Sequence, residues 1–129
     1  MSNQKLESHV VSLEIARELK GAGWEKETEF WWVITLTSNW HISMGKPDEG
    51  WCILNKGNYF AAPLATEILE ELPYRIKGQY GLRIYKFTEY NCQVCYWDLD
   101  GNLKHDEFDK FLPNALAKMW LYLKKENLL

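Results

Sequence analysis

The residues of this sequence whose type and spacing could do chemistry are two cysteines, in the run Cys92-Gln93-Val94-Cys95. A Cys-x-x-Cys pair can bind zinc or carry out disulfide exchange. Cys52 and one histidine would complete a Cys₃His ligand set, and the histidines available are His9, His41 and His105. However, the pair continues into Tyr96 and Trp97, as a strand does, and strand residues three apart face opposite sides. We therefore expect buried strand cysteines, with no bound metal and no disulfide.

A second candidate is the run Trp40-His41-Ile42-Ser43, with Asp48 and Glu49 close behind it. Histidine, serine and a carboxylate can together build a nucleophilic site. The spacing matches no Gly-x-Ser-x-Gly elbow. We therefore expect a solvated loop over residues 38–50, anchored by Trp40.

Two acidic groups have simpler structural explanations. The run 98–102, Asp-Leu-Asp-Gly-Asn, lacks the ligand order of an EF-hand, and its Asp100-Gly101 pair predicts a two-residue hairpin turn instead. Glu67, Glu70 and Glu71 lie opposite the apolar stripe of a predicted helix, which is typical of a solvated face.

Composition limits the partners and the compartment. The 129 residues carry 15 basic and 18 acidic side chains, so the formal net charge is -3. Aromatic side chains interleaved with Arg83 and Lys86 could stack on bases, but without a basic surplus phosphate affinity would be poor. The three cysteines and the absence of an apolar leader predict a cytoplasmic protein in a reducing compartment. The longest uncharged stretch, residues 30–45, contains too many polar residues to span a membrane, so no membrane partner is expected.

These residues must be positioned by a single α+β domain over residues 1–129. Helical periodicity and caps predict helices over 12–22, 63–72 and 113–126. Alternating or apolar runs predict strands over 30–37, 51–55, 82–90, 92–99 and 103–108. The strand over 30–37 is apolar on both faces at its start and should be interior, whereas the charged strand over 103–108 suits a sheet edge. The order α-β-β-α-β-β-β-α predicts an antiparallel sheet of four to five strands with helices packed on one face.

Two helix stripes define the expected core. In the helix over 63–72, Leu69 lies centrally in a stripe whose other members are Leu64, Ala65, Ile68 and Leu72. In the closing helix the stripe is Leu112, Leu116, Met119, Trp120 and Leu123. Leu121 lies opposite that stripe, where a polar residue is expected.

Several segments resemble small proteins encoded by bacteriophages and prophages. They are the aromatic strand Phe30-Trp31-Trp32-Val33 and residues 10–20, 59–73, 114–123 and 127–129, in the same order along nearly the whole chain. Pro63 departs from that pattern, which tends to have threonine there. The resemblance implies a phage or mobile-element origin and a bacterial cytoplasmic setting. It implies no reaction, no catalytic residue and no cofactor.

We therefore expect a non-catalytic accessory protein that acts through protein–protein contacts, with an unidentified protein partner or by self-association. The predicted contact residues are those around the exposed side of the closing helix and the aromatic loop: Lys118, Leu121, Tyr122, Lys125 and Trp40. One alternative is a small metal-binding or hydrolytic enzyme that uses Cys92, Cys95 and a histidine. A second alternative is a weak nucleic-acid binder.

Overall fold

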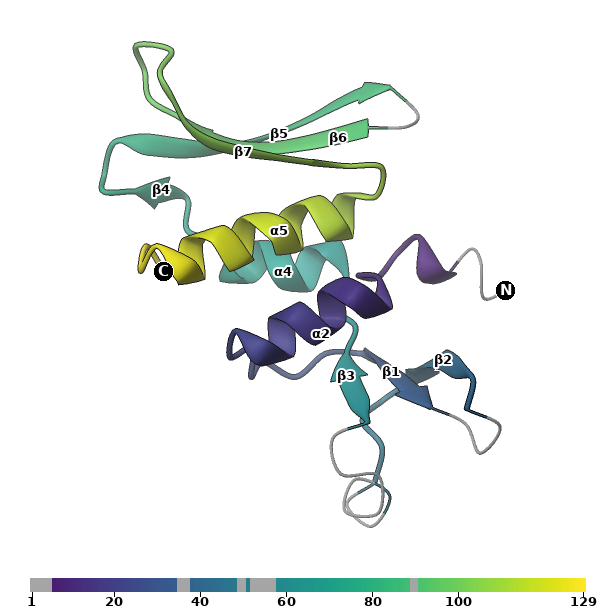
Figure 1. Cartoon of the computed structure of the whole chain (residues 1–129). Helices are drawn as coiled ribbons and strands as arrows, with labels where there is room; N and C mark the ends of the chain where they lie inside the picture. Colours follow the sequence, from purple (N-terminus) through teal and green to yellow (C-terminus); the bar gives the residue numbers. More distant parts are fainter. Residues whose placement is uncertain (1–5, 35–37, 49–50, 52–57, 89–90) are drawn as a thin grey trace.

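Two antiparallel sheets lie on opposite sides of a layer of helices (Figure 1). The computed structural model describes residues 6–34, 38–48, 51, 58–88 and 91–129. Helices α4 (Ala65–Glu71) and α5 (Leu112–Lys125) lie under the four-stranded sheet, and helix α2 (Leu13–Gly21) lies between them and the three-stranded sheet. The α+β class and the antiparallel pairing are confirmed, whereas the prediction of one sheet is wrong.

The three-stranded sheet has the order β2-β1-β3. Strand β1 (Phe30–Ile34) is central, as predicted, with Trp31, Trp32 and Val33 buried. Its neighbours are β2 (Trp40–Met44) and β3 (Tyr59–Ala61). The loop expected over 38–50 is therefore wrong for residues 40–44, which pair with β1 from Ile34↔Trp40 to Phe30↔Met44. The strand predicted over 51–55 lies outside the described residues, except for Trp51.

The four-stranded sheet has the order β4-β5-β6-β7. Its strands are β4 (Arg75–Ile76), β5 (Tyr80–Thr88), β6 (Asn91–Trp97) and β7 (Leu103–Asp109). The last three were predicted, including the edge position of β7, and only the two-residue β4 was missed.

The turn between β6 and β7 is longer than the predicted two-residue loop. A two-residue turn of the Asp-Gly type requires positive φ at both residues. Here only Gly101, at +83°, is left-handed in the turn. The Asp98 carboxylate instead accepts hydrogen bonds from the backbone of Asp100 and Asn102 and from the Asn102 side chain, at 2.7–3.0 Å, so the loop spans residues 98–102.

Helix α5 is the centre of the core because it contacts β6 and β7 on one side and α2 and α4 on the other. Leu116, Met119 and Leu123 are completely buried, as the predicted stripe requires, but Ala115 and Ala117 are completely buried as well. Leu121 is half-buried and packs against the core. The prediction that it projects opposite the buried face is therefore wrong, because a helix that contacts four elements has little free face.

Helix α4 is rotated relative to its predicted stripe. Ile68 is completely buried and Leu72 nearly so, whereas Leu69 is 40% exposed. The helix is held at its start by Glu67, whose carboxylate accepts hydrogen bonds from the Leu64 and Glu29 backbone N–H groups at 2.8 and 3.0 Å. The predicted central position of Leu69 is wrong.

Candidate functional site

The cysteine pair lies within strand β6, where Cys92 and Cys95 are both buried. Residues three apart in a strand face opposite sides of the sheet, so the two sulfur atoms point away from each other. Cys95 Sγ accepts the Trp97 indole N–H at 2.9 Å, and Cys92 Sγ lies 3.9 Å from the Lys110 carbonyl oxygen. Burial raises the pKa of the Cys95 thiol, which opposes formation of a reactive thiolate. The third cysteine, Cys52, lies outside the described residues.

The histidines are dispersed over different elements. His9 precedes α2, and His41 lies on β2 with its Nδ1 buried and without a hydrogen-bond partner among the described residues. His105, on β7, stacks on Tyr122 with ring centroids 3.5 Å apart, and its Nε2 meets the Glu107 carboxylate. No group of three or more His, Cys, Asp or Glu in the described ranges could hold a metal ion.

The run 40–43 forms strand β2 rather than a reactive loop. Trp40 packs on Phe60 with centroids 5.6 Å apart, and the Arg17 guanidinium lies over both rings. Asp48 accepts the Trp51 backbone N–H at 2.8 Å, away from the strand, and Glu49 lies outside the described residues. The histidine, serine and carboxylate are therefore not shown to converge.

The predicted contact residues of the closing helix are mostly engaged within the chain. Lys118 Nζ lies 3.0 Å from the Asp109 carboxylate, and Tyr122 is covered by the His105 ring. Leu121 is half-buried, and Lys125 is the exposed member of the set. The acidic face of α4 is likewise engaged, because Glu70 and Glu71 lie 2.9 and 3.6 Å from Lys26 Nζ.

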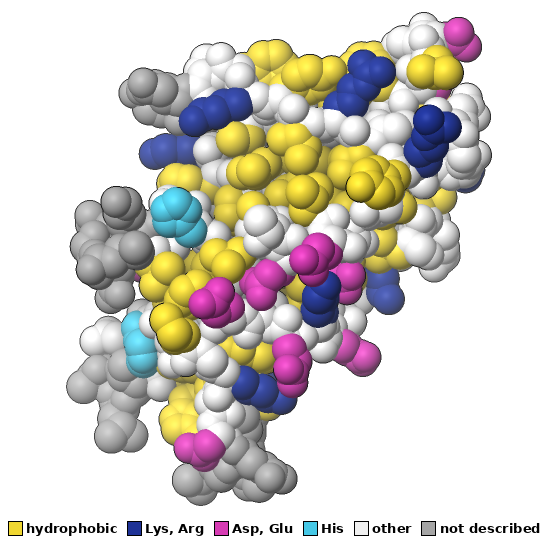
Figure 2. Space-filling model, turned by 180° about the vertical axis from the view of Figure 1, so that it is seen from behind, with side chains coloured by type: hydrophobic (Ala, Val, Ile, Leu, Met, Phe, Trp, Pro, Cys, Tyr) yellow, Lys and Arg dark blue, Asp and Glu magenta, His cyan; other side chains and the backbone are white. Residues whose placement is uncertain are grey.

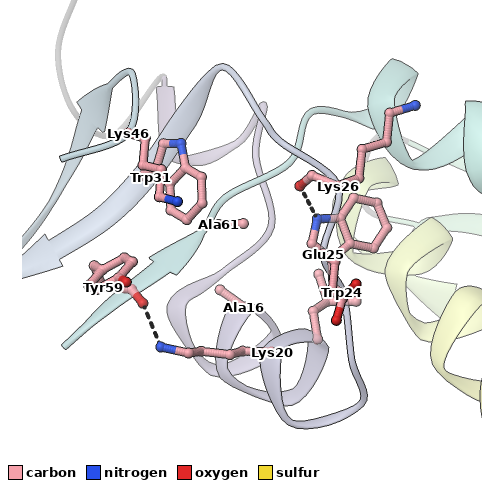
Figure 3. A pocket seen from close by; sticks show the side chains of 10 residues that line it. Ala16, Lys20, Trp24, Glu25, Lys26, Trp31, Lys46, Tyr59 and Ala61 are labelled. Carbon is pink, nitrogen blue, oxygen red and sulfur yellow. Dashed lines mark hydrogen bonds between the residues drawn. The ribbon is translucent and has the colours of Figure 1, made fainter. Parts of the chain in front are cut away.

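An aromatic pocket of about 250 Å³ lies between α2 and the three-stranded sheet (Figure 3). Trp24, Trp31 and Tyr59 contribute rings to its walls. Two of its polar groups are already used: Lys20 Nζ donates to the Tyr59 carbonyl at 3.3 Å, and the Trp24 indole donates to the Lys26 carbonyl at 3.0 Å. Lys46 Nζ lies 5.8 Å from the centre of the Trp31 ring. These contacts resemble internal packing more than a site with convergent free polar groups.

Strand β5 presents the most distinctive unpartnered feature, a long open edge. Its inner neighbour β6 pairs with it from Gly81↔Trp97 to Thr88↔Asn91. Its outer neighbour β4 pairs only at Tyr80 and Gly81, and the last hydrogen bond on that side runs from Leu82 N–H to the Tyr74 carbonyl at 2.9 Å.

The direction of the free backbone groups follows from this bond. Since the Leu82 N–H points away from β6, strand alternation makes the N–H and C=O of Ile84 and Lys86 point outward too. The register with β6 is regular up to Lys86, so this alternation holds over both residues. From Arg83 to Thr88 the strand is exposed. Neither β4 nor any other described strand covers the outward groups of Ile84 and Lys86. We call residues 83–87 the open edge.

Two hollows, which we together call the apolar groove, lie along the inner side of the open edge, and the second also has Lys86 and Lys110 on its wall. One hollow, of about 630 Å³, is lined by Leu69, Tyr74 and Leu82, and a second, of about 450 Å³, is lined by Ala65, Ile84 and Phe111. Leu69 and Ile84 are each 40% exposed. From behind, hydrophobic side chains form a continuous band below the four-stranded sheet, with acidic side chains along the lower border of the band (Figure 2).

The outer side of the same edge is aromatic. Phe87 stacks between Tyr85 and Phe108, with centroids 6.0 and 6.4 Å apart, and all three rings are exposed. A strand added at the open edge would therefore meet apolar side chains on both faces of the sheet. Sequence reasoning missed this site because the exposure depends on how short β4 is, and a two-residue strand has no periodic signal.

Comparison with protein-family models, with curated proteins and with solved structures finds no match for this chain. The resemblance to phage proteins therefore stays a prediction. Within the described ranges, none of the helices combines the length and apolar character needed to span a bilayer.

Proposed function

We propose that this protein is a non-catalytic accessory protein, of phage or mobile-element origin and acting in the bacterial cytoplasm, and that its open edge is the surface through which it contacts a protein partner. The observation that carries the proposal is the edge of β5 that no described strand pairs with, between the apolar groove and the exposed aromatic rings. The predicted contact residues on the closing helix are a weaker candidate surface than the open edge, since three of the four are engaged or half-buried within the chain.

The chemistry of the edge selects an extended strand as its occupant. Outward N–H and C=O groups at Ile84 and Lys86 are satisfied by a neighbouring backbone that alternates in the same way. Alternate side chains of such a strand would enter the groove beside Leu69, and the others would lie beside Tyr85 and Phe87. The ligand should therefore be apolar at alternate positions and free of proline in its centre.

The test is a selection of displayed ten-residue peptides on the wild-type protein, followed by binding measurements on two variants. Ile84→Pro removes the outward N–H, which makes no bond within the sheet, and Ile84→Ala removes a similar amount of side chain but keeps the N–H. Peptides should lose about tenfold or more of their affinity for Ile84→Pro, and much less for Ile84→Ala.

Hydrogen exchange on the wild-type protein supplies a measurement that does not depend on how the variants fold. In dilute, monomeric protein the amides of Ile84 and Lys86 should exchange rapidly, and they should become protected when a selected peptide binds. Peptides that bind Ile84→Pro as well as wild type, or that protect α5 amides instead, would place the contact surface elsewhere.

A further inference from the structure

We infer that the strand recognised by the open edge is the same edge of a second copy, so that two four-stranded sheets join through antiparallel β5–β5 pairing with Tyr85 on the two-fold axis. This inference rests on the proposed function of the open edge and names its occupant.

The backbone narrows the register and charge completes the choice, because an axis at Lys86 would place two lysines directly opposite each other, which destabilises a strand pair. In a two-fold antiparallel pair, opposed residues must point to the same face of the sheet, so the axis passes through a residue rather than between two. An axis at Ile84 would require the Leu82 N–H, which is already bonded to the Tyr74 carbonyl. An axis at Tyr85 opposes Ile84 to Lys86 of the other copy, and each of these symmetry-related pairs exchanges N–H···O=C bonds from the groups that are free.

The length of the pairing is also determined by the structure. With the axis at Tyr85, residues 83–87 of each copy oppose residues 87–83 of the other. Beyond this range Thr88 would meet the other copy where β4 already occupies the edge. The register of β5 shifts between Lys86 and Thr88, and such an irregularity bends a strand. The pairing therefore ends near Phe87, before it reaches Leu82, whose N–H is already bonded to the Tyr74 carbonyl.

The side-chain pairs in this register are compatible. On the outer face Tyr85 meets Tyr85, and Arg83 meets the exposed ring of Phe87, a cation–π pairing. On the inner face Ile84 meets the aliphatic stem of Lys86. No two like charges are directly opposed, which would destabilise a strand pair.

The opposite edge of the sheet differs in a way that supports this choice. Strand β7 carries Lys104, His105, Asp106, Glu107 and Asp109 among its seven residues. Charged side chains on an edge prevent strand addition. The open edge contains only Arg83 and Lys86 as charged residues, so the sheet is protected on the β7 side and available on the β5 side. Pairing through one edge closes as a dimer and does not propagate.

The experiment is a charge exchange at the proposed axis, measured by analytical ultracentrifugation over a concentration series and by native mass spectrometry. Wild type should dimerise reversibly. Tyr85→Asp and Tyr85→Lys should each weaken the dimer about tenfold or more, because like charges then oppose each other across the axis. An equimolar mixture should recover a heterodimer, since Asp now opposes Lys. The matched control is Leu99→Asp in the exposed β6–β7 turn, which should dimerise as wild type does.

Tyr85 is already 39% exposed, so these substitutions should leave the melting temperature nearly unchanged, which circular dichroism verifies. A wild-type chain that stays monomeric throughout, or variants that dimerise equally well, or a mixture that forms no heterodimer, would overturn the inference. If monomeric wild type still binds selected peptides at the open edge, the proposed function stands and only self-pairing is wrong. If neither peptides nor a second copy bind there, both are wrong.

Discussion

Truncation of two adjacent residues in α4 tests whether the core has been placed correctly. Ile68 is completely buried and belongs to the core cluster, whereas Leu69 is 40% exposed on the wall of the groove. Each change to alanine removes three carbon atoms. For Ile68 the lost transfer energy is about 2.4 kcal/mol at ~0.8 kcal/mol per carbon, and the residual cavity increases the cost to about 3–4 kcal/mol.

For Leu69 the same arithmetic gives a smaller cost. Only about 60% of the side chain is removed from water, so the transfer energy falls to about 1.4 kcal/mol. The groove is already open to solvent, so no closed cavity forms, and alanine is a slightly better helix former than leucine. We expect a net cost of about 1 kcal/mol.

Urea unfolding of the wild-type protein and both variants, at one protein concentration, measures the two free energies. The m-values should agree, so that the differences report stability alone. The expected order is a loss at Ile68→Ala at least twice that at Leu69→Ala. Equal losses, or a larger loss at Leu69, would mean that α4 packs through its other face, and the groove beneath the open edge would not exist.

Three further predictions concern buried polar groups of strand β6 and of the loop that follows it. Tyr96→Phe removes the hydroxyl that donates to the Pro73 carbonyl at 2.7 Å, and should cost about 1–2 kcal/mol in urea unfolding because that carbonyl is left unpaired. Cys95 should resist alkylation in the folded protein at pH 8, and react rapidly in urea, as judged by peptide mass mapping, because burial both encloses the thiol and raises its pKa. The Asp98 carboxylate accepts hydrogen bonds, of which those from Asn102 contribute most, and they lower its pKa. The contribution of Asp98 to stability is therefore complete above the unfolded pKa of about 3.9 and is lost as the pH falls through the lower folded value. Wild type should therefore lose more stability than Asp98→Ala when thermal unfolding is compared at about pH 7 and about pH 2; equal losses would contradict the assigned role of Asp98.

The long periodic elements could be predicted from the sequence because their signals are local. Ser12 caps α2 by accepting the Ile15 backbone N–H at 3.3 Å, and the apolar spacing after it locates the helix. The β5–β6–β7 meander follows from alternation and from a Gly-containing turn. These features are specified within a few residues, so tertiary context does not alter them.

The features of the fold that the sequence patterns did not predict depend on interactions between distant segments. Alternation predicts that β1 is a strand but does not say which strands share its sheet, so one sheet was expected where there are two. Strand β2 contains His41 and Ser43, whose weak strand preference is overcome by pairing with β1. Helical spacing assigns Leu69 and Leu121 each to one face of its helix. Whether that face is buried depends on which other elements cover it, which the spacing does not show.

The open edge is a place where the sequence departs from what folding alone requires. The core is completed by α5, α4 and the inner face of β6, where Val94 and Tyr96 are fully buried. The β5 side chains from Arg83 onward add exposed surface, including the 60% exposed ring of Phe87. A strand that served only the core could stop where β4 stops, near Leu82. Exposed apolar side chains on both faces of an unpaired edge carry a risk of aggregation, which β7 avoids by its charges. Local departures of this kind are expected at functional sites, and the proposed two-fold register through Tyr85 would limit the risk by closing the edge.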